Sequence, residues 1–445
     1  ELILELFVDR WAKPWSKYCE ENKLLWTGHY WEHGWPKPTD GSDESSFYIY
    51  HQQPGVDMLG NTYTPNGLGG QFGNTRAIRE LHSAANQAGH NRMLSETYGG
   101  AGWEINFANF KRLVDWEVVL GVNFVNQHLS YFTIKGVRKF DYPPSFSYHE
   151  PWWENYKPMG DYIGRISMAM STGEQINKTL VLQPNTTAWS YFSRIVKNAT
   201  IDTIQDNFKH FVFLLERAHY EYDLGSELVL RTIGSVNNGK LVIGKRAYSL
   251  VVIPATMENL DQNSYKLLQE YLLQGGRVLS FTHNIPRMDG AESNLNNELM
   301  TAFSKQWSFS NAPDDEIART ALRDPDFDIT ESLPLTGELY HQRRILKDGE
   351  LLFFVNTDTT QNVSATITGN GKSLVKMDIN DGSCSLVPVK SENGQISFDM
   401  ELPPIGSALY FLTKTNTAAV SASAIAATAT AANGSEIPIE NPVSE

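Results

Sequence analysis

Residues 1–178 alternate short apolar runs with amphipathic helical patterns, and this alternation restricts the fold more than any other feature of the chain. The runs expected to form strands are 24–28, 56–59, 92–96 and 122–126, and the expected helices are 75–89, 106–120 and 156–171. A strand, a helix and a further strand connect with right-handed crossovers and form a parallel sheet. We therefore predict an α/β architecture whose parallel sheet is either open or closed into a barrel.

Polar and aromatic side chains follow each of these expected strands. The residues concerned are His29, Trp31, Glu32, Asp57, Glu96, Tyr98, Trp103 and His128. The C-terminal ends of the strands are where a (β/α)8 barrel carries its active site. About four strands are expected, so we predict the C-terminal half of such a barrel. The other half would precede Glu1, so we expect the chain to be a fragment of a larger protein.

The stretch "RMLSETYGGAGWE", residues 92–104, carries the strongest candidate for a catalytic residue. Glu96 comes directly after an apolar run, and Tyr98 and Trp103 could bury its carboxylate and raise its pKa by desolvation. Glycines at 99, 100 and 102 would let a substrate approach the backbone. The alternative is a loop carboxylate that caps the next helix or pairs with Arg92.

The segment 27–36, "TGHYWEHGWP", contains an H-x-x-E-H spacing that also occurs in one class of zinc peptidase. That motif needs a helix to direct both imidazoles to one ion. Gly34 and Pro36 break any helix here, so we reject the peptidase interpretation. We predict instead that His29, Trp31 and Glu32 form a polar, aromatic sugar subsite.

The segment 126–153 is a long irregular loop that is rich in aromatic residues. Loops of this length in compact domains are usually functional or disordered, and so many aromatic side chains disfavour disorder. Flat aromatic faces beside His128 and the acid Glu150 suit a carbohydrate ligand. Trp152 and Trp153 either contact that ligand or anchor the loop, and the sequence leaves both possibilities open.

The later part of the chain divides into three regions. Residues 179–335 are expected to form a small flavodoxin-like α/β domain without a Gly-rich phosphate loop, so we predict no nucleotide site. Residues 336–414 carry short strands separated by turn residues and are expected to form a β-sandwich. Residues 415–445 are low in complexity and are expected to be a linker or tail.

The formal net charge of -14 disfavours nucleic acid and anionic membrane surfaces as partners, because both require a positive surface. A neutral carbohydrate is compatible with this charge. No run of about 18 apolar residues is present, so we expect no membrane span. We expect a periplasmic or extracellular bacterial protein, and the oligomeric state is left open.

Three segments resemble the catalytic barrel of bacterial α-L-rhamnosidase-like glycoside hydrolases of family 106. They are "LSETYGGAGWE" (94–104), "DWEVVLGVNFVNQHLSYFTIKGVRK" (115–139) and "DYPPSFSYHEPWW" (141–153). The family 42 β-galactosidases are similar in layout, with a barrel, a small α/β domain and a β-domain. The resemblance is strongest over residues 90–175.

The resemblance implies a role for Glu96 at the end of barrel strand seven. In an inverting rhamnosidase that position holds the general base, and in a retaining member of the wider clan it holds the nucleophile. The acid on strand four would lie upstream of Glu1. The resemblance also implies a calcium ion that bridges protein acids and sugar hydroxyls, without indicating its ligands.

We therefore expect a glycoside hydrolase that acts on terminal α-L-rhamnose of a polysaccharide or oligosaccharide. In this hypothesis His128 and Glu32 bind hydroxyls, and Trp31 or Trp103 forms the sugar platform. The alternatives are a retaining β-galactosidase-like enzyme and a carbohydrate-binding remnant without turnover. The hypothesis requires Glu96 to share one cleft with His29 and His128.

Overall fold

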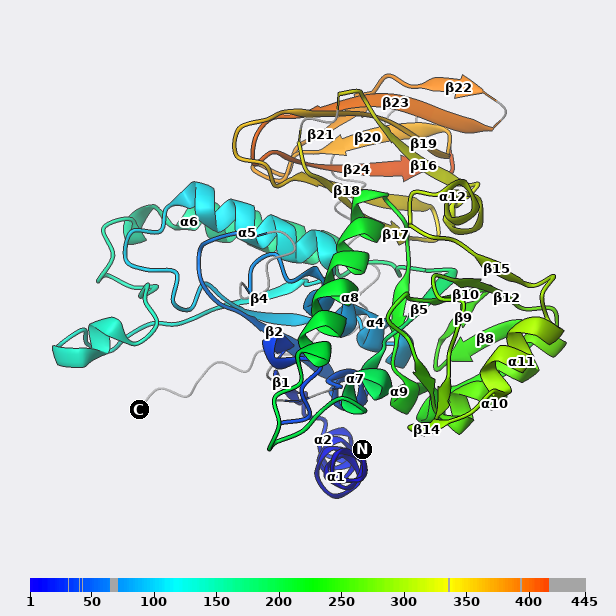
Figure 1. Cartoon of the computed structure of the whole chain (residues 1–445). Coiled ribbons are helices and arrows are strands. Elements are labelled where there is room, and N and C mark those ends of the chain that lie inside the picture. Colours follow the sequence, from blue (N-terminus) through cyan, green and yellow to red (C-terminus); the bar gives the residue numbers. More distant parts are fainter. Residues whose placement is uncertain are drawn as a thin grey trace.

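The computed structural model describes residues 1–30, 32–39, 41, 43–64, 71–334, 337–392 and 394–415. Within these residues the chain forms an open parallel sheet, a second parallel sheet and a pair of antiparallel sheets (Figure 1). The protein is therefore of mixed α/β class, as the sequence predicts. None of the helices in this part of the chain is both long and apolar enough to cross a membrane.

The first sheet has four parallel strands in the same order as they occur in the chain. They are β1 (Thr27–Gly28), β2 (Gln53–Met58), β3 (Leu94–Thr97) and β4 (Phe124–Gln127). The helices that follow β2, β3 and β4 are α4 (Thr75–Ala88), α5 (Phe107–Leu120) and α6 (Lys157–Ala169). In the described part of the chain β1 and β4 each pair on one side only, so both edges of this sheet are open.

Local sequence signals set the ends of the helices on either side of β3. Helix α4 ends at Gly89, whose φ of +83° places it in the left-handed region that favours glycine. Helix α5 begins at Asn106, which forms a reciprocal capping box with Asn109, and ends at Gly121. These ends leave short connections before β3 and β4, and so determine where both strands begin.

The strands of this sheet are shifted relative to the sequence prediction. Only Thr27–Gly28 of the predicted strand 24–28 pairs with a neighbour, and Leu24 and Leu25 are exposed. The predicted strand 92–96 forms as Leu94–Thr97, because Thr97 still pairs with Met58 of β2. Glu96 therefore lies inside β3, one residue before the strand ends.

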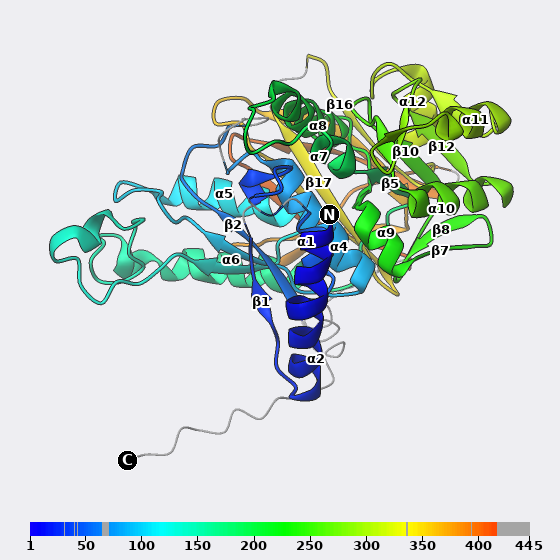
Figure 2. The same cartoon turned by 60° about the horizontal axis from the view of Figure 1, so that its bottom comes forward.

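A helical segment precedes the sheet and lies beside β1 (Figure 2). It consists of α1 (Leu2–Phe7), a π-helical turn η1 (Val8–Ala12) and α2 (Lys13–Glu21). Ala12 and Cys19 on its inner face pack against Trp26 and Phe47.

The second sheet has five parallel strands in the order β15-β12-β10-β5-β6. These are β5 (Thr179–Leu182), β6 (Asp223–Gly225), β10 (Leu250–Ile253), β12 (Arg277–Ser280) and β15 (Trp307–Phe309). The helices are α7 (Asn185–Trp189), α8 (Ala199–Arg217), α9 (Glu227–Ile233), α10 (Gln262–Leu273), α11 (Leu295–Ala302) and α12 (Glu316–Leu322). Short strands β7 (Gly234–Asn237), β8 (Lys240–Ile243), β9 (Arg246–Tyr248), β11 (Asn259–Leu260), β13 (Arg287–Met288) and β14 (Ala291–Glu292) form two small additional sheets.

The carboxyl edge of this second sheet, where such sheets bind ligands, packs against the first part of the molecule. Trp35 is fully buried there, and its ring N–H donates to Asn185 Oδ1 at 2.8 Å. Ser226, which follows β6, donates its hydroxyl to Asp43 at 2.5 Å. Side chains of the first part therefore occupy a place where a doubly wound domain could hold a ligand.

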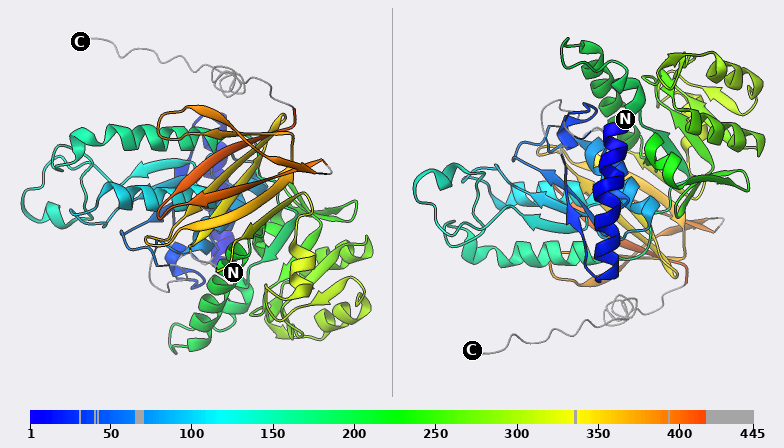
Figure 3. Two further views of the ribbon diagram at one scale, coloured as in Figure 1. Left: turned by 90° about the horizontal axis from the view of Figure 1, so that it is seen from above. Right: turned by 90° about the horizontal axis from the view of Figure 1, so that it is seen from below.

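Two antiparallel sheets form a sandwich that lies above the rest of the molecule in Figure 1 and faces the viewer in the left panel of Figure 3. One sheet contains β16 (Phe327–Glu331), β19 (Val363–Asn370), β23 (Gln395–Leu402) and β22 (Lys390–Glu392). The other contains β17 (Leu339–Ile345), β18 (Gly349–Asn356), β24 (Ser407–Thr413), β20 (Ser373–Met377) and β21 (Cys384–Val387). Because β16 pairs with β19, the first strand of these two sheets lies before residue 336. The expected tail beyond Thr415 lies outside the described residues.

A buried ion pair joins the first two parts of the molecule. Arg79 on α4 donates through Nε and Nη2 to the two carboxylate oxygens of Glu216 on α8, at 2.6 and 2.7 Å. Tyr222 donates its hydroxyl to the same carboxylate at 2.6 Å. All three side chains are buried, so α4 is held between the first sheet and α8 by a fully hydrogen-bonded charge pair.

Candidate active site

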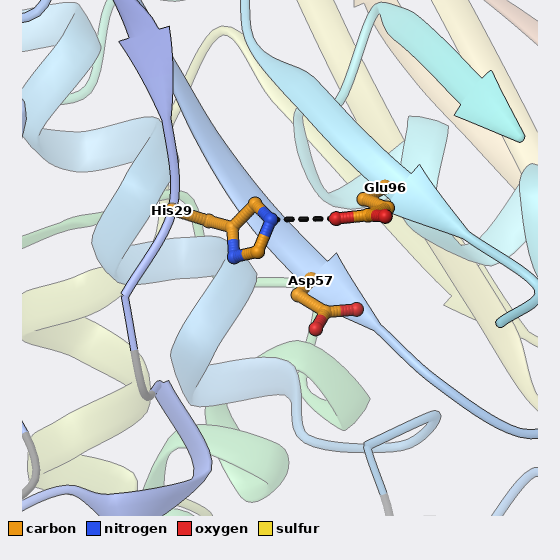
Figure 4. Close-up of side chains that lie close together, drawn as sticks. All are labelled: His29, Asp57 and Glu96. Atoms are coloured by element: carbon orange, nitrogen blue, oxygen red, sulfur yellow. Dashed lines mark hydrogen bonds and ion pairs between the residues drawn. The ribbon is translucent and has the colours of Figure 1, made fainter. Parts of the chain in front are cut away.

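The carboxyl ends of the four parallel strands bring titratable side chains together. Asp57 on β2 is the register partner of Glu96 on β3, and Glu96 is the partner of Asn126 on β4. Partners in neighbouring strands project to the same face of a sheet. His29 follows β1 and points toward Glu96 and Asp57 (Figure 4).

Two histidines flank the Glu96 carboxylate. His29 Nε2 lies 2.6 Å from Glu96 Oε2, as a hydrogen bond in which the imidazole donates. His128 Nε2 lies 4.0 Å from the other oxygen, Oε1. The Glu96 side chain remains 26% exposed, so it is open to solvent. Glu96 therefore shares one site with His29 and His128, as the sequence hypothesis requires.

Asp57 is the second carboxylate of this site. One of its oxygens, Oδ1, is buried and has no hydrogen-bond partner among the described residues. Burial raises the pKa of Asp57 to about 6, and the negative charge of Glu96 acts in the same direction. The positive charge that His29 and His128 can carry opposes this shift. Asp57 is therefore a polar group with unused hydrogen-bonding capacity.

The turn after β3 depends on a glycine for its packing. A Cβ atom at Gly99 would lie 2.7 Å from Leu59 Cδ2 and 3.0 Å from His128 Cγ. Such contacts are too close for an ordinary side chain. The glycine that the sequence suggested for substrate access instead permits His128 to pack beside β3.

A hollow of about 560 Å³ opens beside Glu96. It is lined by Glu96, Asn126, Gln127, Leu129, Ser130, Phe146, Trp153 and Tyr156. Of these described residues only Glu96 carries a charge. The hollow therefore combines one carboxylate with amide groups and aromatic faces, a combination suited to a neutral polyhydroxylated ligand.

The structure distinguishes the two neighbouring tryptophans. Trp152 packs against Phe110 and Phe146 of the apolar core, with ring centroids 5.1 and 5.5 Å apart. Trp153 is exposed and stacks on Tyr156 at 5.8 Å with an interplanar angle of 15°. Trp152 therefore anchors the loop, and Trp153 presents an aromatic face at the hollow.

Three of the residues that were predicted to contact substrate point into the protein interior instead. Tyr98 is fully buried and donates its hydroxyl to the backbone carbonyl of Phe110 at 2.8 Å. Glu32 is also buried, and its Oε1 accepts from the Tyr48 hydroxyl at 2.9 Å. Glu150 is buried within its loop. Burial raises the pKa of Glu32 and of Glu150 to about 7. These three residues are therefore not open to a substrate in this structure.

Trp103 and Trp31 are the two side chains that were predicted to stack against the sugar. The ring N–H of Trp103 donates to the backbone carbonyl of Lys139 at 2.8 Å, so this half-buried side chain braces the long loop. Trp103 does not line the hollow described above. Trp31 lies outside the described residues.

Asn126 and Tyr156 line the hollow but were not among the residues singled out from the sequence. Asn126 could have been found from the alternation of β4, because it projects to the same face as Glu96 once the strands are in register. Tyr156 lies just before α6, far along the chain from Glu96. No local pattern indicates that it reaches the same hollow.

His29, Asp57 and Glu96 together have the donor atoms of a metal site. Each offers one ligand atom, and the three atoms lie within 4.8 Å of one another. Calcium takes six to eight oxygen ligands, whereas this set offers two carboxylates and an imidazole nitrogen. The mixed nitrogen and oxygen donors of these three side chains therefore suit zinc and related ions better than calcium.

No protein-family model matches the chain, and none of the curated proteins matches it either. Several solved structures are similar to it. A rhamnosidase from Novosphingobium sp. PP1Y matches with a TM-score of 0.67 and 17% identity, over 91% of this chain and 38% of that one. An exo-carrageenase GH42 from Bacteroides ovatus matches with a TM-score of 0.55 and 12% identity, over 85% of this chain and 50% of that one.

A β-galactosidase from Rahnella sp. R3 is similar as well, with a TM-score of 0.56 and 10% identity, over 92% of this chain and 67% of that one. The chain has the fold of part of these glycosidases. It spans about two fifths of the rhamnosidase and half of the carrageenase.

Proposed function

We propose that this protein is a glycoside hydrolase in which Glu96 is a catalytic carboxylate. The observation that carries the proposal is the position of Glu96 at the carboxyl end of β3, between His29 and His128 and beside the hollow. The likeness in fold to three glycosidases supports it. The hollow, with Trp153 at its rim, would hold the sugar.

The mechanism that we propose is inverting hydrolysis of terminal α-L-rhamnose, with Glu96 as the general base. Glu96 would take a proton from water as that water attacks the anomeric carbon. Inverting enzymes hold their two carboxyl groups about 6.5–9.5 Å apart. Oxygens of Asp57 and Glu96 approach within 4.8 Å, which is close for such a pair. We therefore propose that the general acid lies outside residues 1–445, on a strand that would pair with an open edge of the first sheet.

A retaining mechanism is the second candidate, because one oxygen of Asp57 and one oxygen of Glu96 lie within 4.8 Å of each other. Retaining glycosidases hold their two carboxyl groups about 5–5.5 Å apart. In this mechanism Glu96 attacks the anomeric carbon and forms a glycosyl-enzyme, and Asp57 donates a proton to the leaving group. Asp57 then takes a proton from the water that releases the sugar.

The test is a screen of the full-length protein on aryl glycosides, including aryl α-L-rhamnoside and aryl β-galactoside. Proton NMR of the first sugar released reports both the substrate and the anomer. We expect release of the inverted anomer from the rhamnoside. Release of the retained anomer would support the retaining mechanism, in which Asp57 is the acid and base. Sugar binding without hydrolysis of any glycoside would contradict an enzymatic function.

Trp153 should contribute to substrate binding more than any other exposed tryptophan. We expect Trp153→Ala to raise KM roughly tenfold, equivalent to about 1.4 kcal/mol, because the sugar loses an aromatic face. Steady-state kinetics on the best aryl glycoside measure this effect. Trp15→Ala is the matched control, since Trp15 is similarly exposed but lies on α2. An unchanged KM for Trp153→Ala would show that the sugar binds elsewhere.

A further inference from the structure

We propose that His29, Asp57 and Glu96 bind a divalent transition-metal ion of the zinc class in preference to calcium. The three side chains come from the ends of β1, β2 and β3 and point toward one another (Figure 4). In the part of the chain that the structure describes, this is the one group of three or more such side chains that could hold an ion.

The distances among the three donors are close to those that a zinc ion requires. Zinc binds imidazole nitrogen and carboxylate oxygen at about 2.0–2.2 Å, which places tetrahedral ligands about 3.4 Å apart. His29 Nε2 and Glu96 Oε2 are now 2.6 Å apart, and all three donors lie within 4.8 Å. Side-chain rotations that move the donor atoms by about 1 Å would admit the ion. Bonds to the ion would then replace the hydrogen bond between His29 and Glu96.

Asp57 has unused hydrogen-bonding capacity at this place. Its Oδ1 is buried and has no hydrogen-bond partner among the described residues. A buried polar atom without a partner is costly, and a bound cation would remove that cost. His128 Nε2 lies 4.0 Å from the other oxygen of Glu96, beside this group.

The charges and the exposure of the site also suit a divalent cation. Two carboxylates balance the charge of one such ion. In the described part of the chain Glu96 forms its ion pairs with His29 and His128. No lysine or arginine side chain there competes with a metal ion for the Glu96 carboxylate. The His29 side chain is 31% exposed, which leaves a route for the ion from solvent.

The ion would inhibit the proposed hydrolysis, because it would occupy the carboxylate of Glu96. This consequence rests on the proposed function, whereas metal binding itself does not. Hydrolysis should fall in proportion to zinc occupancy and return when a chelator is added. Zinc binding without loss of hydrolysis would contradict the inhibition and leave the site itself unaffected.

The experiment is calorimetric titration of ZnCl2 into the untagged full-length protein in a non-chelating buffer. We expect one ion per chain at this site, and His29→Asn and Asp57→Asn should each weaken its binding by more than about 100-fold. Loss of outer-shell partners alone costs about 10–100-fold, and these residues would be direct ligands. His283→Asn is the control, because His283 is exposed and stacks on Phe309 away from the site.

A second measurement uses cobalt in place of zinc, because the visible spectrum of bound Co²⁺ reports tetrahedral coordination in the unmodified protein. Calcium at a hundredfold excess should leave this spectrum unchanged. The proposal is overturned if His29→Asn binds zinc as tightly as the unmodified protein, or if calcium displaces the cobalt. Absence of hydrolysis on every glycoside would instead contradict the proposed function, without bearing on metal binding.

Discussion

Replacing Glu96 by Gln should lower kcat by a factor of about 10² to 10⁴, which is the usual contribution of a general base. The amide has nearly the shape of the carboxylate and can still accept the hydrogen bond from His29. It cannot take a proton from water or attack an anomeric carbon. Steady-state kinetics on the best aryl glycoside should therefore show a large loss in kcat with a small change in KM.

The matched control for this variant is Glu104→Gln. Glu104 is exposed on the turn that follows Tyr98, so it lies in the same stretch of sequence but outside the hollow. The kcat of this variant should stay within about twofold of the kcat of the unmodified protein. The activation free energy would then change by no more than the order of RT. A loss of less than tenfold for Glu96→Gln would mean that another group performs the chemistry.

The substitution Arg79→Met should reduce the free energy of unfolding by about 3–5 kcal/mol. The substitution leaves the Glu216 carboxylate buried on α8 without its bidentate partner, and only the Tyr222 hydroxyl then donates to it. Removing one member of a buried charge pair is far more costly than replacing both. Denaturant unfolding followed by circular dichroism measures the change.

The double variant Arg79→Met/Glu216→Leu distinguishes the effect of lost packing on stability from the effect of an unpaired buried charge. It should recover much of the lost stability, because both charges are replaced by apolar groups of similar volume. Lys13→Met, which breaks the exposed pair of Lys13 with Asp9, should cost no more than about 1 kcal/mol. An Arg79→Met variant within 1 kcal/mol of the unmodified protein would show that Glu216 is neutral or solvated.

The ends of the helices around the site followed from local sequence. Helical spacing and the signals at Asn106, Gly89 and Gly121 are local, because capping and left-handed backbone involve residues a few positions apart. The same reasoning placed Glu96 at the end of an apolar run. In a parallel sheet that position reaches the edge that carries polar side chains, so the identity of the central carboxylate was accessible from the sequence.

The direction in which each neighbouring side chain points could not be predicted from local sequence in the same way. Tyr98 and Glu32 are polar and lie beside strand ends, as site residues do. Each turns inward because its hydrogen-bond partner, the Phe110 carbonyl or the Tyr48 hydroxyl, is brought there by packing. The adjacent Trp152 and Trp153 differ for the same reason, since one meets the aromatic core and the other meets solvent.

An α/β chain whose strand ends present Glu96 with His29, Asp57 and His128 could be predicted from the residue pattern alone. Patterns of period 2 and 3.6, together with turn residues, are enough for that, because they report which side of each element is buried. The packing of the whole chain selects which of the surrounding acids and aromatic residues reach the hollow. That choice depends on strand register and on contacts between residues distant in the chain, and a single sequence does not encode them locally.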